Sequence, residues 1–403
     1  MTSDCYRTVS EARIVNMLLL AGWAFEVAAG AHAQAAAQSR DALERWIGLG
    51  LGFQRSAEGE RYFDPVEVAN FLVWAGRSGR DSFWFERYVR TGRLLVEGAR
   101  AWEQKEQFHL TLRRRFNLRA FKPGIGLRLR MPVPLEGAYA GGLEMRPVIP
   151  RSLSGAVTCN AGRMEVRVET SSAAEVEFGV DVSFAAKRVP AGGARLAEVE
   201  QEIYLRPVEG LVRVSPRVRA LAEALAGGAQ NPRETLRAFW AYMMDELWCG
   251  AIHYDQVTSD APCDWVLDTR WYDCQIGSAL FVSLCRARGI PARIVSGHVL
   301  YVLAPTKHFW IEAWLDGEGW VPFDLANWGL ALGPHDAAWR DHFFGKIDFR
   351  LVTEVLPLAF TGPMSVKLPP RWHMLQTAAS AGIDIEFLEL GGDMIYRDSV
   401  AVF

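Results

Sequence analysis

The chain has 403 residues, of which 50% are apolar and 23% are charged, and its formal net charge at pH 7 is −3. This length has room for two to four domains with sizeable cores, and the composition is that of a globular protein. A charge so close to zero gives no general attraction to nucleic acid or to an anionic membrane, so we expect neither as a partner.

Residues 1–105 are predicted to form a helical N-terminal region. One amphipathic stripe combines Leu18, Leu19, Trp23 and Val27. Farther along, residues 64–67 (DPVE) form a capping box with proline at the first helical position, and residues 83–104 continue as another helix. No chemistry is recognisable here. A lid, a dimer surface and a plain scaffold all remain open, and scaffold is the favoured interpretation.

Residues 15–35 resemble a weak signal peptide ending in A-H-A. However, Glu26 interrupts the apolar run, and Asp4 and Glu11 precede it where a signal peptide carries positive charge. We therefore expect a cytoplasmic protein with an N-terminal helix, with secretion as the alternative. No apolar run has the length of about 18–20 residues that a membrane span needs.

Residues 106–206 change to strand periodicity. Apolar residues alternate with polar ones from Phe108 to Leu118, and the pattern recurs up to Phe184. Several half-buried strands separated by glycine and proline turns predict a β-rich, sandwich-like domain. A basic run of Arg113, Arg114, Arg115 and Arg119 is interpreted as a solvated strand face, with docking of an acidic carrier protein as the alternative.

Residues 207–270 return to helical periodicity. Ser215-Pro216 begins one predicted helix, and the capping box at residues 231–234 (NPRE) begins the next. Nine of the 15 tryptophans lie between residues 240 and 339. This concentration predicts either an aromatic-walled cleft or a tryptophan-rich core.

A helix is predicted from Cys274 to Arg288, because apolar residues recur there at spacings of three, four and seven. Asp273 is its candidate N-cap, and Gly289 its C-cap. Cys274 then lies in the first turn, where unpaired N–H groups and the helix dipole favour a thiolate. The same groups could hold the oxyanion of a tetrahedral intermediate.

A β-hairpin is predicted to follow, with its turn at residues 316–319 (DGEG). His308, Trp310, Glu312 and Trp314 share one face of the first strand, and Asp324 lies at the end of the return strand. His308 and Asp324 straddle the turn, so they should lie nearly opposite each other. A carboxylate beside an imidazole fixes its tautomer. The order cysteine, histidine, aspartate therefore indicates nucleophilic acyl transfer.

The stretch DCQIGSALFVSLCRARGIPARIVSG followed by HFWIEAWLDGEGWVPFDLA resembles the transglutaminase-like superfamily, within the papain-like thiol fold. The resemblance extends over about residues 213–345. It implies Cys274 as the nucleophile, His308 as the base and Asp324 as the third member. It also implies an oxyanion site that pairs the cysteine N–H with an upstream side chain. Trp248, Tyr254, Trp265 and Trp271 remain open for that role. The family often has Ala after the His and Pro-Thr after the Asp, whereas this chain has Phe309 and Leu325-Ala326, a difference that bears on substrate.

Other chemistry is not indicated by the sequence. Six cysteines in this length make no disulfide framework, no C-x-x-C pair suggests zinc, and no phosphate-binding loop is present. We expect no metal and no cofactor. No carboxylate cluster predicts calcium dependence.

The predicted fold class is α+β. A helical region (1–105) and a β-rich domain (106–206) precede a transglutaminase-like catalytic core (207–345), and the strands of 346–403 complete that core. The predicted function is thiol-dependent acyl transfer from a peptide, protein or carrier-bound acyl substrate, with Trp248, Trp271 and Trp310 as substrate-binding residues. A cysteine peptidase or amidase is the alternative, and a silent binding or scaffold protein is the third possibility. The sequence leaves the acceptor and the oligomeric state open.

Overall fold

The computed structural model has a mixed α+β fold, as the sequence predicts. It describes residues 8–22, 32–100, 107–119, 121–137, 139–151, 157–160, 162–170, 174–186, 195–254, 256–258, 260–301, 305–325, 337–347, 350–356, 372–379, 382–389 and 394–403. Trp23 and Val27 of the predicted N-terminal stripe lie outside these residues, as does the side chain of Leu19. None of the described helices is long and apolar enough to cross a membrane.

The N-terminal region is built from helices around a small antiparallel sheet of order β1-β3-β2. Its elements are β1 (Val9–Ser10), α1 (Glu11–Gly22), α2 (His32–Gly48), β2 (Gln54–Arg55), β3 (Arg61–Phe63), α3 (Pro65–Arg77) and α4 (Ser82–Arg100). Helix α3 begins where the sequence predicts, because the Asp64 side chain accepts hydrogen bonds from the backbone N–H groups of Val66 and Glu67. Leu18 and Trp46 are completely buried between these helices.

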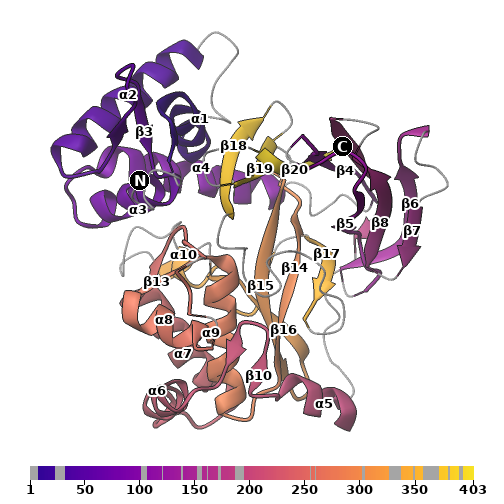
Figure 1. The fold of residues 1–403 in the computed structure, drawn as a ribbon. Coiled ribbons are helices and arrows are strands. Elements are labelled where there is room, and N and C mark those ends of the chain that lie inside the picture. Colours follow the sequence, from indigo (N-terminus) through magenta and orange to yellow (C-terminus); the bar gives the residue numbers. More distant parts are fainter. Residues whose placement is uncertain are drawn as a thin grey trace.

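Two antiparallel sheets form a β-sandwich, whose strands β4 to β8 lie on the right of Figure 1. One sheet has the order β18-β19-β20-β4-β9-β6 and the other β5-β8-β7, and the paired strands are antiparallel. The strands are β4 (Gln107–Asn117), β5 (Gly126–Pro132), β6 (Ala140–Val148), β7 (Val157–Asn160), β8 (Arg163–Glu169), β9 (Glu175–Ala186), β18 (Trp372–Ala379), β19 (Gly382–Glu389) and β20 (Met394–Val402). Side chains from both sheets, among them Phe108 and Met164, share one core.

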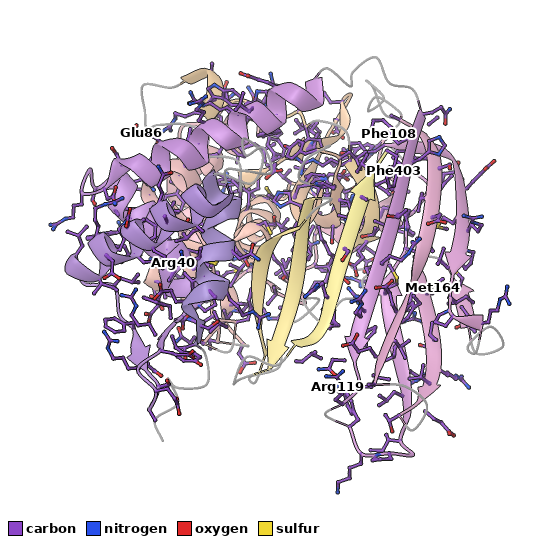
Figure 2. The ribbon with its side chains drawn as sticks, turned by 90° about the horizontal axis from the view of Figure 1, so that it is seen from above. Arg40, Glu86, Phe108, Arg119, Met164 and Phe403 are labelled. Atoms are coloured by element: carbon purple, nitrogen blue, oxygen red, sulfur yellow. The ribbon has the colours of Figure 1, made fainter. Side chains whose placement is uncertain are left out.

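The last three strands correct the prediction that residues 346–403 complete the catalytic core. Strand β20 pairs with β4, and β18 and β19 extend the sandwich sheet. Figure 2 shows these three yellow strands at the side of the sandwich that faces the N-terminal helices. Among the described strands of this segment, β17 (Arg350–Val355) alone joins the core sheet. Alternation of apolar residues predicts a strand but not its neighbour, which explains the error.

The basic run on β4 is neutralised within the sandwich. Arg113 pairs with Asp181, and Arg115 pairs with Glu177. Arg114 is only 4% exposed and binds Asp398 through two hydrogen bonds. The predicted solvated face is therefore wrong for Arg114, and the partners of all three residues come from the same chain.

The region predicted to be the catalytic core packs helices against the four-stranded antiparallel sheet β16-β15-β14-β17. Its sheet strands are β14 (Ala292–Val299), β15 (Thr306–Leu315), β16 (Gly319–Phe323) and β17. Its helices are α5 (Glu198–Tyr204), α6 (Pro216–Ala226), α7 (Pro232–Glu246), α8 (Pro262–Thr269), α9 (Cys274–Ala287) and α10 (Ala337–Arg340). Two small pairs complete it: β10 (Val208–Glu209) with β11 (Val212–Arg213), and β12 (Trp248–Cys249) with β13 (Trp271–Tyr272).

Helix α9 is the central helix of this core and is buried along most of its length. Its apolar side packs on the face of β15 that carries Phe309, Ile311 and Ala313. The opposite face of β15 carries His308, Trp310 and Glu312, the alternation that the sequence predicts. One continuous apolar cluster joins α9 to the N-terminal helices, so these two parts of the chain share a core.

Candidate active site

Cys274 is the first residue of α9, and Asp273 caps the helix. One carboxylate oxygen of Asp273 accepts hydrogen bonds from the backbone N–H groups of Gln275 at 3.0 Å and Ile276 at 2.9 Å. The helix ends at Ala287, and Gly289 follows with a φ of +72°, as expected for a glycine after a C-cap. These local features hold the half-buried Cys274 at the start of a rigid helix.

The carboxylate of Asp273 is buried and is held by Tyr254. The Tyr254 hydroxyl lies 2.9 Å and 3.0 Å from the two carboxylate oxygens, to which it donates. Burial raises the pKa of the Tyr254 hydroxyl well above its usual value, so the hydroxyl keeps its proton. Because its hydroxyl is engaged with Asp273, Tyr254 is a poor choice among the upstream side chains considered for an oxyanion site.

The Cys274 thiol is not stabilised as a thiolate in the way that its helical position suggests. Burial raises the pKa of the thiol well above its usual range, and the charge of Asp273 raises it further. The backbone N–H of Phe309 acts in the opposite direction. Burial and the charge of Asp273 thus oppose the thiolate that the position in the first helical turn favours. A carboxylate cap occupies the N–H groups of Gln275 and Ile276 and adds a negative charge beside the sulfur.

His308 and Asp324 meet across the β15–β16 hairpin, as predicted. Ile311 is opposite Phe323 in the strand register, and Asp324 follows directly. The Nε2 atom of His308 lies 2.9 Å and 3.0 Å from the two oxygens of Asp324. An ionised carboxylate only accepts hydrogen bonds, so Nε2 carries the proton and Nδ1 is the basic nitrogen.

Cys274 lies beside this pair. Its sulfur interacts with the backbone N–H of Phe309, the residue that follows His308. The charge of Asp324 also acts on the thiol. The structure therefore places the Cys274 thiol at the backbone of Phe309 and within electrostatic range of Asp324, which binds His308.

Arg350 is a member of the site that sequence reasoning missed. It begins β17, at the other edge of the sheet from β16, and its Nη1 atom lies 2.7 Å from Asp324 Oδ2. Both side chains are fully buried. Burial alone would raise the pKa of Asp324, but the charges of His308 and Arg350 overcome this effect and lower it to about 2.

Arg350 lies near the Trp310 ring, and that ring in turn lies close to Gly297. The guanidinium of Arg350 lies 5.2 Å from the centroid of the Trp310 ring. In β14, Gly297 is opposite His308, and a Cβ atom there would lie 2.0 Å from the carbonyl oxygen of Leu351 and 3.0 Å from the Trp310 ring. The sequence carries no signal for this arrangement, because Arg350 lies outside the motif and in a different strand.

The three tryptophans predicted to bind substrate differ in their burial. Trp248 and Trp271 are half-buried on the paired strands β12 and β13, with their ring centroids 5.5 Å apart. Trp310 is completely buried and packs edge-on against Tyr139 of the sandwich side. It has no surface to offer a substrate, so the prediction for Trp310 is wrong. It supports Arg350 instead.

Two other cysteines, unlike the half-buried Cys274, are fully enclosed by the protein. Cys263 and Cys285 are completely buried in the core, and burial raises the pKa of both thiols, that of Cys263 to about 11. Within the described residues, no group of three or more His, Cys, Asp or Glu side chains could hold a metal ion.

Comparison with known proteins gives a family for the region that contains Cys274, His308 and Asp324. Residues 219–325 match the model of the transglutaminase-like superfamily. A protein-glutamine gamma-glutamyltransferase from Pseudomonas aeruginosa is 28% identical over 120 residues, which are 27% of this chain. The chain spans only 18% of the length of that relative.

Two solved structures are similar over larger parts of the chain. A protein from Cytophaga hutchinsonii, described as a candidate cysteine protease, is 14% identical, with a TM-score of 0.44 over 73% of this chain and 98% of its own. The periplasmic domain of TgpA from Pseudomonas aeruginosa is 17% identical, with a TM-score of 0.32 over 62% of this chain and 94% of its own. That relative is periplasmic, which contradicts the cytoplasmic location expected from the sequence.

Proposed function

Because residues 219–325 form a transglutaminase-like domain, we propose that this protein transfers acyl groups through a thioester on Cys274. One observation carries the proposal. The sulfur of Cys274 lies at the backbone of Phe309, beside His308, and the Nε2 proton of His308 is bound by the buried Asp324. The basic Nδ1 of His308 is then the atom that accepts the thiol proton.

The proposed reaction begins from a neutral thiol. His308 takes the proton of Cys274, and the thiolate attacks the carbonyl carbon of an amide while the carbonyl oxygen becomes the oxyanion. The backbone N–H of Cys274 is the proposed main-chain donor to that oxyanion. The C–N bond then breaks, His308 gives its proton to the leaving amine, and a thioester remains on Cys274.

A second nucleophile completes the cycle. A primary amine attacks the thioester, His308 accepts the proton of that amine, and the thiol is restored with a new amide as product. Water in place of the amine would make the protein a hydrolase. The gamma-glutamyl transfer named for the Pseudomonas relative favours the side-chain amide of a protein glutamine as the acyl donor.

The first test measures the alkylation of Cys274 against pH by mass spectrometry of labelled peptides, with Cys263 and Cys285 as internal references. We expect Cys274 to react faster than both buried thiols at pH 7. In His308→Ala the rate should fall by about 10²–10⁴, the usual contribution of a general base. Equal rates for the three cysteines, or an unchanged His308→Ala variant, would remove the basis of the proposal.

The second test identifies the acceptor. A glutamine-containing peptide and a primary-amine probe are incubated with the wild type and with Cys274→Ala. Amine incorporation that depends on Cys274 supports transamidation. Conversion of glutamine to glutamate, or peptide cleavage, without amine incorporation would show that the protein is a hydrolase instead of a transamidating enzyme.

A further inference from the structure

Helix α3 lies outside the transglutaminase-like domain. It contacts the loop of residues 248–254, which leads towards the active site. The side-chain amide of Asn70 makes two hydrogen bonds to the backbone of Ala251. Nδ2 donates to the carbonyl oxygen at 3.1 Å, and Oδ1 accepts from the backbone N–H at 2.8 Å. The amide thus satisfies both polar groups of one peptide residue, as a neighbouring strand would, and fixes its position.

Two further side chains at the ends of α3 contact the same loop. At the N-terminus, Asp64 lies 3.0 Å from Nε2 of His253, and both side chains are almost buried. At the C-terminus, the guanidinium of Arg77 lies 4.3 Å from the ring centroid of Trp248. One helix of the N-terminal region therefore contacts the loop at Trp248, Ala251 and His253. Figure 1 shows this helix on the side of that region nearest β13.

Gly250 shows how closely the loop is enclosed. A Cβ atom at this position would lie 2.2 Å from Oδ1 of Asn70 and 2.6 Å from the ring of Trp271. Both distances are shorter than any real contact of a Cβ atom. The loop thus lies directly between α3 and the strand that precedes Cys274.

The held loop continues into the catalytic machinery. Its strand β12 pairs with β13, opposing Trp248 to Trp271. Three residues after Ala251, the Tyr254 hydroxyl donates a hydrogen bond to Asp273, the cap of the helix that carries Cys274. A shift of Ala251 would therefore move both half-buried tryptophans and the support of Asp273.

We propose that α3 is a positioning element of the active site, with Asn70 as the positioning residue. Its amide sets the place of Ala251, and through it the Trp248–Trp271 pair and the contact of Tyr254 with Asp273. This inference rests on the proposed function, since it assigns a role towards the reaction at Cys274. It replaces the scaffold interpretation of the N-terminal region for this one helix.

The test compares Cys274 alkylation in Asn70→Ala and Asn70→Asp with the wild type from pH 5 to 8. We expect Asn70→Ala to react about ten times more slowly at pH 7. In Asn70→Asp the ionised carboxylate accepts from Ala251 but cannot donate to it. A protonated carboxyl has the shape of the amide and can do both, so the rate of Asn70→Asp relative to the wild type should rise as pH falls.

A purely structural role for Asn70 predicts another pattern. Thermal unfolding would change while the alkylation rate of the folded protein, and its relative pH dependence, would stay at the wild-type level. That pattern would overturn the proposal. If Asn70→Ala does not fold, a flat pH ratio for Asn70→Asp would overturn it equally.

The matched control is Arg80→Ala. Arg80 lies just beyond the end of α3, and its guanidinium stacks on Trp74 of the same helix at 5.4 Å. In Arg80→Ala, Cys274 should be alkylated at the wild-type rate. Failure of the proposed function is distinguishable from failure of this inference. In that case Cys274 of the wild type would react no faster than Cys263 and Cys285, and His308→Ala would not slow it, whatever residue stands at position 70.

Discussion

At the scale of single residues, the site depends on the buried ion pair between Asp324 and Arg350. Asp324 and Arg350 are both inaccessible to water, and His308 completes the arrangement on the other side of the carboxylate. Water cannot screen these charges, so each partner is needed to stabilise the others. The carboxylate thereby stays ionised beside the imidazole, as the proposed role of His308 as a base requires.

Replacing Arg350 by methionine should therefore impair both stability and reactivity. Removal of one partner of a buried ion pair typically costs about 3–5 kcal/mol. The folded-state pKa of Asp324 is depressed to about 2, so its stabilising effect is present above its unfolded pKa and is lost as pH falls through about 2. In Arg350→Met that pKa rises, and the loss should begin at a higher pH. Denaturant unfolding at several pH values measures this.

The double variant Arg350→Met/Asp324→Asn provides the control. This variant has no unpaired Asp324 carboxylate, so its free energy of unfolding should lie between those of Arg350→Met and the wild type. Alkylation of Cys274 should stay slow. Full recovery of the alkylation rate would show that Asp324 does not orient His308.

At the scale of elements, the start of α9 combines two opposing effects. The cap by Asp273 fixes the helix, and its charge raises the pKa of the thiol beside it. Asparagine caps a helix as well as aspartate does and carries no charge. The two effects of the cap can therefore be separated by substitution.

Asp273→Asn should lower the pKa of Cys274 and move its alkylation profile to lower pH, with little change in stability. Asp273→Ala also removes the charge but loses the cap, at a cost of about 1 kcal/mol. Mass-resolved alkylation and thermal unfolding of both variants provide the measurement. An alkylation profile that does not move in either variant would mean that burial alone sets the pKa of the thiol.

At the scale of the whole molecule, the three parts of the chain are joined by shared cores. The apolar cluster of α9 extends into the N-terminal helices. Leu300 and Leu351 of the catalytic core belong to the apolar cluster of the sandwich. The hydroxyl of Tyr139 also donates to the buried Glu312 of β15 at 2.7 Å. The sandwich and the core should therefore unfold together.

Leu351→Ala tests this connection. The side chain is completely buried, and its truncation should cost about 2–5 kcal/mol. Tryptophan fluorescence follows mainly the catalytic core, and circular dichroism follows all secondary structure. Both should report one transition, at a lower temperature than in the wild type. A sandwich that unfolds separately would give two transitions.

The sequence alone determined the local features of this protein. The cap at Asp273, the helix from Cys274 and the opposition of His308 to Asp324 were predictable, because capping, helical periodicity and a short turn act over a few residues. Only the tertiary structure decided that β20 pairs with β4, that Arg350 reaches Asp324, that Trp310 is buried and that Asn70 holds Ala251, 181 residues away. Strand periodicity does not encode a partner, and a buried charge or amide finds its counterpart only when distant segments pack together.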